Sequence, residues 1–348
     1  MTTTVLDSLN DSLHQMMHED ERVIVMGEDI LDPYGGAFKI TRGLSTKFPD
    51  RVWTTPISEA GFVGVATGMA MRGLYPVVEI MFGDFVMLTA DQLVNHAAKF
   101  QWMYNDKVQV PLVVRAPMGG RRGYGPTHSQ TLEKHLMGVP GLAVVAANPL
   151  VDPGSMLRRS VLDDRRPVLF IENKKMYARA LQVPDRGRVG PMTAQRHGKT
   201  YPTITLGFGD FEQADATLVA YGGMAALAME AAERMLIEHE CYVEVVCPTS
   251  LHPLDVEPIA GSVARSGRLV VCEESTGAVG FGAEVCASVT DEAFEVLEEA
   301  PRRVAAEPTP IPNAPKMEQA MLPGVDDLVV ALRECVSMPQ GEIRYRTG

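Results

Sequence analysis

Short β-branched and aliphatic runs alternate with helix-like segments along most of this chain, and this alternation limits its fold more than any other feature. Helices are expected near 59–72, 87–101 and 151–163. The strand-like runs of the first half are RVIVM at 22–26, YPVVEI at 75–80, VPLVVRA at 110–116, LAVVAA at 142–147 and PVLFIE at 167–172. Strands that alternate with helices favour an α/β architecture. The chain is therefore predicted to have an α/β fold with mainly parallel sheets.

A second series of strands and helices occupies the carboxyl-terminal part of the chain. It begins with the strand-like ATLVAYGG at 216–223, which ends in a glycine turn, and with an alanine-rich helix at 225–239. The runs YVEVV at 242–246 and RLVVCEE at 268–274 continue the series, and a short helix is expected at 325–336. This repetition of one pattern indicates two α/β units in tandem.

The two series are separated by a stretch with a different composition. Residues from about 173 to 213 lose the alternating rhythm and are rich in Gly, Pro and Arg, which is typical of a linker. The length of 348 residues also fits two domains of ordinary size better than one core. We predict a first domain at 1–185, a linker at 186–213 and a second domain at 214–348.

Composition and charge exclude several classes of function. The formal net charge of −12 disfavours nucleic-acid and anionic-membrane partners, which need clustered Lys and Arg. No secretory signal is recognised at the amino terminus and no apolar run has the length of a membrane span, so a cytoplasmic location is expected. The five cysteines lack zinc-type or redox-type spacing, which predicts reduced thiols and no metal site in this chain: Cys241, Cys247, Cys272, Cys286 and Cys335.

Two segments combine side chains that are typical of an active site. The first, PISEAGFVGVATG at 56–68, places Glu59 at the start of a helix that is rich in small residues. The second, RRGYGPTHSQ at 121–130, carries His128 in a glycine-rich loop, where binding and catalytic groups are frequent. No P-loop, G-x-G-x-x-G after a first strand or G-x-S-x-G elbow is present, which leaves nucleotide-phosphate, nicotinamide and serine-hydrolase sites without support.

These segments and others along the chain resemble one known family. The matching pieces, in their shared order, are GEDI at 27–30, GGAFKITRGL at 35–44, RVWTTPISEAGFVG at 51–64, FGDF at 82–85, DQLVNHAAK at 91–99, HSQ at 128–130, PGLAVV at 140–145, PVLFIENKKMY at 167–177 and LHPLD at 251–255. Together they resemble the β subunit of the thiamine-diphosphate-dependent decarboxylase component of 2-oxoacid dehydrogenase complexes. The resemblance implies a transketolase-like pyrimidine-binding domain followed by a transketolase-type carboxyl-terminal domain.

The resemblance also implies roles for individual residues. Glu59 matches the carboxyl group that holds the aminopyrimidine nitrogen of thiamine diphosphate and so favours removal of the thiazolium proton. Phe85 matches an aromatic residue that packs on the aminopyrimidine, and Ile57 is expected to contact the cofactor as well. His128 matches a histidine that faces the substrate and the acyl acceptor. His135 is a further candidate for substrate or carrier contact.

Half of the expected active site is missing from this sequence. Family enzymes hold Mg²⁺ and the cofactor diphosphate with a GDG segment and a later Asn, whereas this chain has only GDF at 83–85 and 209–211. We therefore predict an α-type partner that holds most of the Mg²⁺ site, and an α2β2 heterotetramer. The acceptor of the acyl unit is expected to be a lipoyl-bearing acyltransferase or an acyl carrier protein.

Some residues depart from the family pattern. Arg121 and Arg122 stand where small or uncharged residues are usual, and Gly138 replaces a frequent histidine. Paired guanidinium groups can bind phosphate or carboxylate, so both arginines are candidate substrate or carrier contacts. Together with Gly138, they leave open a transketolase-like transfer of a two-carbon ketol unit from a sugar phosphate to a carrier protein in a specialised biosynthetic pathway. A noncatalytic assembly scaffold is the alternative of another class.

Further positions are assigned to packing or left open. His96 is expected to serve packing or an interface, and His252 to approach the site from the second domain. Some relatives bind a monovalent cation near 160–166, but only Asp164 matches, because Arg166 replaces a neutral ligand. No potassium site is predicted.

Overall fold

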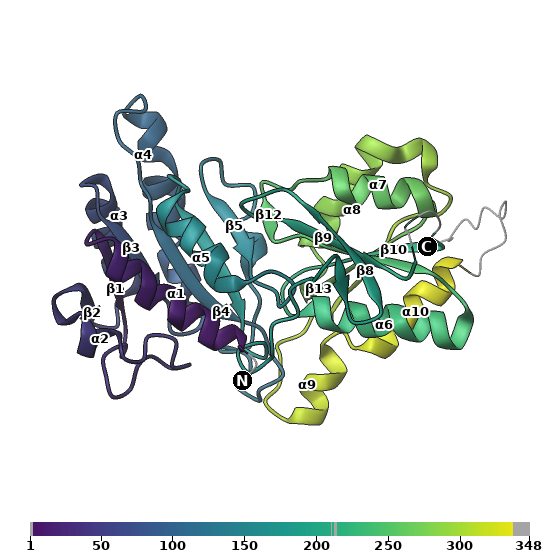
Figure 1. Ribbon diagram of the computed structural model, residues 1–348, viewed down its shortest axis with the longest axis horizontal. Helices are drawn as coiled ribbons and strands as arrows, with labels where there is room; N and C mark the ends of the chain where they lie inside the picture. The colour runs from purple at the N-terminus through teal and green to yellow at the C-terminus, as the bar shows by residue number, and fades with distance from the viewer. Residues whose placement is uncertain (1–2, 210, 212–213, 337–348) are drawn as a thin grey trace.

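The computed structural model describes residues 3–209, 211 and 214–336, which form two α/β domains side by side (Figure 1). Each domain is built on a seven-stranded sheet. The central strands of both sheets are buried along all or nearly all of their length, as the continuous apolar runs of the sequence predict for a sheet covered on both faces. The predicted α/β fold is confirmed. No helix in these ranges is long and apolar enough to cross a membrane.

The first sheet has the strand order β12-β5-β6-β4-β3-β1-β2. All pairs are parallel except β12 with β5. The strands are β1 Val23–Gly27, β2 Val52–Thr54, β3 Tyr75–Glu79, β4 Val113–Met118, β5 Ala143–Ala146, β6 Val168–Asn173 and β12 Ser250–His252. Because β12 belongs to the second half of the sequence, the two domains share this sheet.

Helices cover both faces of the first sheet. The predicted helices at 59–72 and 151–163 are confirmed, whereas the one at 87–101 is divided into a 3-10, a π and an α segment. The segments are α1 Val5–Glu19, α2 Leu44–Lys47, η1 Pro49–Arg51, α3 Glu59–Met71, η2 Gly83–Thr89, η3 Gln92–Ala97, α4 Ala98–Met103, η4 Glu133–His135 and α5 Pro153–Leu162. The division orients the residues that follow β3 differently from those of a continuous helix.

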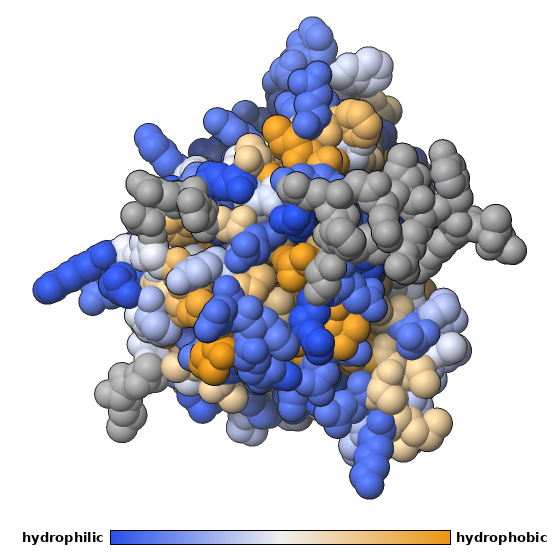
Figure 2. All heavy atoms as spheres, turned by 90° about the vertical axis from the view of Figure 1, so that its right-hand side faces the viewer, coloured by the Kyte–Doolittle hydropathy of each residue, from blue (hydrophilic) through white to orange (hydrophobic). Residues whose placement is uncertain are grey.

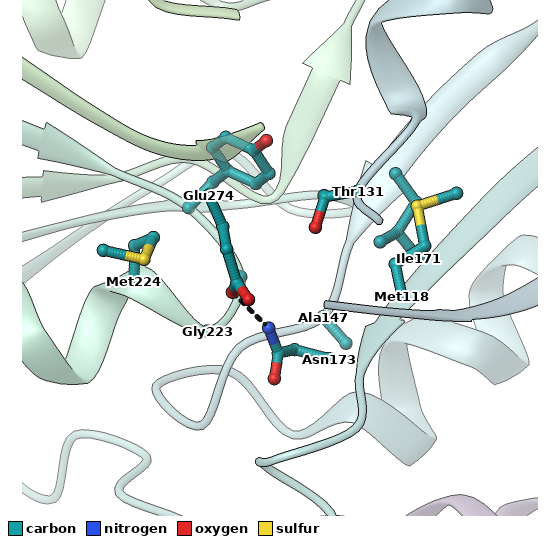
Figure 3. A pocket seen from close by; sticks show the side chains of 10 residues that line it. Met118, Thr131, Ala147, Ile171, Asn173, Gly223, Met224 and Glu274 are labelled. Carbon is teal, nitrogen blue, oxygen red and sulfur yellow. Dashed lines mark hydrogen bonds between the residues drawn. The ribbon is translucent and has the colours of Figure 1, made fainter. Parts of the chain in front are cut away.

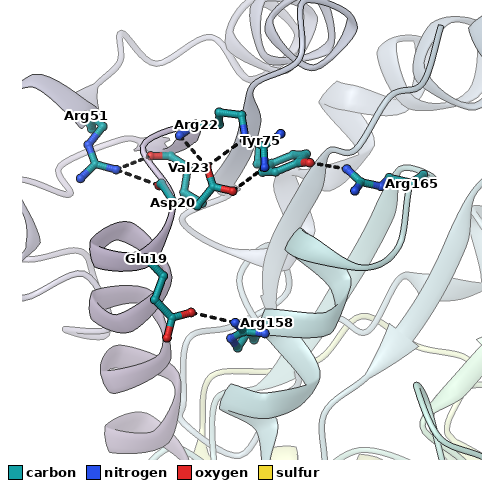
Figure 4. Close-up of polar contacts among 8 residues, drawn as sticks. All are labelled: Glu19, Asp20, Arg22, Val23, Arg51, Tyr75, Arg158 and Arg165. Carbon is teal, nitrogen blue, oxygen red and sulfur yellow. Dashed lines mark hydrogen bonds and ion pairs between the residues drawn. The ribbon is translucent and has the colours of Figure 1, made fainter.

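Polar contacts fix α1 against its neighbours at the amino-terminal edge of the sheet (Figure 4). Glu19, at the end of α1, accepts a hydrogen bond from Arg158 of α5 at 2.7 Å. Asp20 forms an ion pair with Arg22 at 2.6 Å, and its carbonyl accepts a hydrogen bond from Arg51 at 3.0 Å. These contacts lie at the edge opposite to the site described below, so they serve the fold.

The second sheet has the order β14-β13-β10-β11-β9-β8-β7. Strands β10, β11, β13 and β14 are parallel, whereas β7, β8 and β9 form an antiparallel extension. The strands are β7 Arg188–Val189, β8 Met192–His197, β9 Thr203–Gly207, β10 Ala216–Ala220, β11 Val243–Cys247, β13 Leu269–Thr276 and β14 Arg302–Ala306.

The linker predicted at 186–213 is wrong for residues 188–207, because this stretch contributes β7, β8 and β9 to the second sheet. Strand β8, next to the edge strand β7, is only partly buried, so its sequence MTAQRH lacks the apolar run of a central strand. The glycines at 187, 190 and 198 have positive φ values and lie at turns. For these reasons, the composition of this stretch resembled that of a linker.

The helices of the second domain are α6 Met224–His239, α7 Glu257–Ser266, α8 Phe281–Ala293, η5 Phe294–Val296, α9 Pro315–Met321 and α10 Val325–Val336. The predicted helices at 225–239 and 325–336 are confirmed. The end of this domain remote from the first carries mostly hydrophilic side chains with separate apolar areas (Figure 2). This end therefore offers no broad apolar surface in the atoms that are in view.

A shared hydrophobic core joins the domains. Ala146 and Ile171 of the first sheet belong to the same buried cluster as Tyr221, Val246 and Leu251 of the second half. Continuous apolar packing resists relative motion of its parts. Loops that lie between the domains are therefore held by both of them.

Candidate active site

Candidate functional residues collect at the carboxyl edge of the first sheet. Glu28 follows β1, Glu59 begins α3 just after β2, Phe85 follows β3 and His128 lies in the loop after β4. The carboxyl ends of parallel strands meet at one edge, which is where α/β folds bind ligands. The structure thus brings the predicted Glu59, Phe85 and His128 to one side of the domain.

Glu59 lies near a second buried carboxyl group, that of Glu28. Each residue is only 5% exposed. Burial, with help from the charges of Glu59 and Asp29, raises the pKa of Glu28 from 4.5 to about 7. In the described parts of the chain, Oε1 of Glu28 has no hydrogen-bond partner. A buried oxygen without a donor is costly, so this edge is suited to a ligand that supplies one.

Phe85 and His128 lie against each other. Their ring centroids are 5.3 Å apart at an angle of 82°. Phe82 packs edge-on against His128 at 4.7 Å and against Phe85 at 6.2 Å. The two predicted residues therefore belong to one aromatic cluster, in which the imidazole packs against two phenyl rings.

The segment that carries His128 is held by Lys174, which lies just after β6. Its Nζ donates to the carbonyl of His128 at 2.9 Å and to that of Pro117 at 3.3 Å. Burial lowers the pKa of Lys174 to about 8. Beside it, Asp84 accepts hydrogen bonds from the backbone and the amide side chain of Gln130 at 3.1 and 2.9 Å. Both contacts restrict the loop from the side of the first sheet.

A buried ionic cluster supports this edge of the sheet from below. Arg115 of β4 donates to Glu172 at 2.7 and 2.8 Å and to Glu79 at 2.6 Å. Burial opposes its charge, but the Glu172 and Glu79 carboxylates hold the pKa of Arg115 above its ordinary value. Tyr177 completes the cluster by donating to Glu172 at 2.7 Å. Because the three strands β3, β4 and β6 are linked through one cation, their ends form a rigid base.

The two candidate arginines have different surroundings. The guanidinium of Arg121 donates to the carbonyl of Pro323 in the second domain. That of Arg122 is exposed, lies 5.6 Å from the ring centroid of Tyr124 and donates to the carbonyl of Lys174 at 3.2 Å. The structure thus directs Arg122 toward the aromatic cluster and Arg121 toward the domain interface. A substrate role for either remains a prediction.

The remaining candidates are more dispersed. Ile57 precedes α3 and is 86% exposed. His135 is exposed on η4. His252 lies on β12, at the opposite end of the sheet from β2, so the structure does not bring it to Glu59. His96 is on the π segment η3, where its Nδ1 is 3.1 Å from the carbonyl of Asp91.

No cluster of three or more His, Cys, Asp or Glu side chains suited to a metal occurs in the ranges that the structure covers. Asp164, considered above for a monovalent cation, forms a bidentate ion pair with Arg166 at 3.1 and 2.9 Å. Its carboxylate also accepts a hydrogen bond from Tyr201 at 3.1 Å. The acid is therefore already engaged by protein groups.

Sequence reasoning missed Glu28, Phe82 and Lys174. Glu28 and Phe82 lie within matched segments, GEDI and FGDF, and each follows a buried strand, which is a usable signal. Lys174 also lies in a matched segment, PVLFIENKKMY, and follows a buried strand, but its residue type gave no reason to select it, because a lysine after a strand is usually exposed. Only its contact with His128, forty-six positions away in sequence, identifies it.

Comparison with known proteins agrees with this geometry. Residues 2–179 match the model of the transketolase pyrimidine-binding domain, and residues 210–328 match that of the transketolase C-terminal domain. A solved structure described as a split-gene transketolase, an inactive β4 tetramer, is similar in fold, with a TM-score of 0.70 and 21% identity over 95% of this chain and 97% of that one. These features define a transketolase-type protein.

Relatives of higher identity show to which family within this class the chain belongs. A pyruvate dehydrogenase E1 component subunit beta-1 of Arabidopsis thaliana is 37% identical over 94% of this chain and 88% of its own length. The β subunit of an acetoin:2,6-dichlorophenolindophenol oxidoreductase of Bacillus subtilis (strain 168) is 34% identical over 96% of this chain and 97% of its own. The chain belongs to the family of pyruvate dehydrogenase E1 β subunits and their relatives.

Proposed function

We propose that this chain is the β-type subunit of a thiamine-diphosphate-dependent 2-oxoacid dehydrogenase that passes an acyl unit to a carrier-bound thiol. The observation that supports this most is the pair of buried carboxyl groups, Glu28 and Glu59, on the same sheet edge as Phe85 and His128. The relatives named above support the same class of reaction.

The residues present fit the flat, nitrogen-containing ring of thiamine diphosphate. Oxygen Oε1 of Glu28 lacks a donor among the described groups, and Glu59 is a second acid beside it. The half-buried ring of Phe85 offers an apolar face or edge, and the exposed Ile57 an aliphatic contact. An aromatic ring with amine and ring-nitrogen groups satisfies both kinds of partner.

When bound, thiamine diphosphate supplies a carbon nucleophile and an electron sink for decarboxylation. The protein residues are proposed to act on protons and orientation. Glu59 holds a proton at a ring nitrogen, while Glu28 holds the neighbouring acid in place. His128, packed against two phenyl rings, transfers a proton on the substrate side.

A partner chain is part of the proposal. Apolar side chains are exposed beside the site, including Ile57 at 86%, Val65 at 57% and Leu88 at 57%. We propose that an α-type subunit covers them, supplies most of the Mg²⁺ and diphosphate site and completes an α2β2 heterotetramer. A lipoyl-bearing acyltransferase or an acyl carrier protein is the proposed acceptor, and the cytoplasm the proposed location.

Reconstitution tests this function. The chain is combined with its α-type partner, thiamine diphosphate and Mg²⁺, and release of carbon dioxide from pyruvate and branched 2-oxoacids is measured. Parallel reactions offer acetoin with dichlorophenolindophenol, because one relative is named for that reaction, and a ketose phosphate. We expect carbon dioxide from a 2-oxoacid. Consumption of acetoin or ketose phosphate without any carbon dioxide release would contradict the proposal.

Neither alternative gains support. Ketol transfer from a sugar phosphate was suggested by Arg121, Arg122 and Gly138, but the Arg121 guanidinium is engaged by the carbonyl of Pro323. A noncatalytic scaffold has no need for buried acids beside an aromatic cluster, since such acids lower stability. The variant Glu59→Gln separates a scaffold from an enzyme, because only an enzyme has turnover to lose.

A further inference from the structure

The loop that leads to His128 presents backbone N–H groups to acids of the second domain. Gly119, Arg121 and Gly123 have φ values of 91°, 66° and 70°. Alternation of such residues with ordinary ones turns successive N–H groups toward one side and creates a concave site for anions. In this chain the anions are side chains of the other domain.

Two carboxylates occupy this concave backbone. Oε1 of Glu318, on α9, accepts the N–H of Arg121 at 2.7 Å, and its Oε2 accepts that of Gly123 at 2.9 Å. Glu274, on β13, accepts the N–H of Gly120 at 2.7 Å with Oε1. Its Oε2 accepts the side-chain amide of Asn173 at 2.8 Å, beside a small cavity between the domains (Figure 3).

Glu318 is only 2% exposed, so its contacts have little competition from water. Hydrogen bonds to an ionised acceptor are stronger than neutral ones, and a buried charge depends on them. Both oxygens of this carboxylate are engaged by one short loop segment. The geometry therefore couples the charge of Glu318 to the backbone conformation of residues 121–123.

Close packing reinforces the coupling. A Cβ atom added to Gly120 would lie 2.7 Å from Cδ1 of Leu322 and 3.1 Å from Oε1 of Glu318. The Arg121 guanidinium reaches the carbonyl of Pro323 just beyond. At the other end of the loop, Lys174 holds the carbonyl of His128. The segment from 120 to 128 is thus fastened to the second domain at its start and to the first sheet at its end.

We propose that Glu318 is a positioning residue, which fastens the loop from the second domain so that His128 remains packed against Phe82 and Phe85. The inference rests on the proposed function only where turnover is concerned. It assigns the second domain an indirect part in the active site, because that domain holds the His128 loop but contributes no side chain to the aromatic cluster.

The test compares Glu318→Gln with Glu307→Gln in the full chain bound to its α-type partner. Glutamine keeps the size of Glu318 but replaces one acceptor oxygen with a donor, which must then face an N–H group. Glu307 is exposed and close in sequence, so its variant controls for the lost charge. Gly120→Ala disturbs the same contact from the loop side. Hydrogen–deuterium exchange is measured for peptides that cover 119–123 and 124–130, together with kcat and KM.

We expect Glu318→Gln to raise exchange in both peptides by about tenfold or more, and Glu307→Gln to leave it unchanged. Glu318→Gln should lower kcat about tenfold and leave KM within about threefold of the wild-type value. Misplaced catalytic groups affect the transition state more than substrate binding. Gly120→Ala should act in the same direction.

Unchanged exchange in the peptide that contains His128 would overturn the proposal. So would unchanged kcat despite faster exchange, because the contact would then be structural only. The exchange experiment does not require turnover. If the wild-type complex decarboxylates no 2-oxoacid, the proposed function fails while the exchange result still decides whether Glu318 orders the His128 segment.

Discussion

Two pairs of buried acids in this chain have opposite surroundings. Glu28 and Glu59, at the edge of the first sheet, lie together, and Oε1 of Glu28 has no donor among the described residues. Glu274 and Glu318, at the domain interface, each accept a backbone N–H at 2.7 Å. The difference indicates which pair is available to a ligand. Acids with protein donors maintain the architecture, whereas acids without them cost stability and are kept for chemistry.

Of the substitutions considered, Glu59→Gln in the first pair should have the largest effect on activity. Glutamine cannot exchange a proton with the ring nitrogen as the Glu59 carboxyl group does. We therefore expect kcat to fall about a thousandfold, within the usual range for loss of a general acid or base. The measurement is carbon dioxide release by the reconstituted complex, with size-exclusion chromatography to verify assembly. Glu21→Gln, at an exposed position, is the matched control. Activity that survives Glu59→Gln would contradict the mechanism and favour a scaffold.

Glu133→Gln tests a buried acid that shares features of both pairs: it has a protein donor and a raised pKa. Tyr221 donates to its Oε1 at 2.6 Å, while burial raises the pKa of Glu133 from 4.5 to about 7. A raised carboxyl pKa favours folding at low pH, and this contribution is lost as pH rises from 4.5 to about 7. The variant should therefore gain about 3 kcal/mol of unfolding free energy at about pH 8 and little at about pH 4.

Denaturant unfolding of Glu133→Gln at both pH values provides the measurement, and turnover should remain at the wild-type level. A gain of equal size at both pH values would show that relief of a buried charge is not its cause. Loss of turnover would instead place Glu133 among the functional acids.

Glu28→Gln should show that the acids of the first pair lower stability and support activity. Burial and the charges of Glu59 and Asp29 raise its pKa to about 7, so the wild type loses stability as pH rises from 4.5 to about 7. We expect the variant to unfold at a higher denaturant concentration at about pH 8 yet to lose about tenfold in kcat. A variant that is both less stable and fully active would reverse the proposed comparison.

Arg122→Ala is expected to have the smallest effect. Its guanidinium is exposed and contacts Tyr124 and the carbonyl of Lys174, so screening by water limits its pull on a substrate. KM should rise about threefold with kcat unchanged. Steady-state kinetics at low and high salt give the measurement. A KM increase of a hundredfold would show that Arg122 binds a charged group directly and would revive the sugar-phosphate alternative.

Much of the fold was predictable because central parallel strands are buried on both faces and read as apolar runs, as in β3 and β6. Glu59 and His128 could be found because they lie in short segments of distinctive composition. The edge strand β7 and its neighbour β8 could not, since partly exposed strands resemble polar loops. The role of Glu318 was also hidden, because its partners are about two hundred positions away.

The direction of Arg121 shows a further limit of sequence reasoning. Adjacent arginines in a loop suggest a paired clasp, but a backbone φ of 66° at Arg121 turns it toward Pro323, while Arg122 lies near Tyr124. Backbone conformation at a non-glycine position with positive φ is uncommon and is determined by the surrounding tertiary contacts. Residue type alone therefore overstated the similarity of the two side chains.

The pairing of strand β12 limits how the gene for this protein can be divided or recombined. It lies in the second half of the chain but pairs with β5, at the border of the first sheet. A gene cut between the domains would leave the hydrogen-bonding groups of β5 uncovered, and such borders promote aggregation. Recombination among relatives should therefore preserve both halves together. The smallest exchangeable unit of this protein is larger than either of its domains.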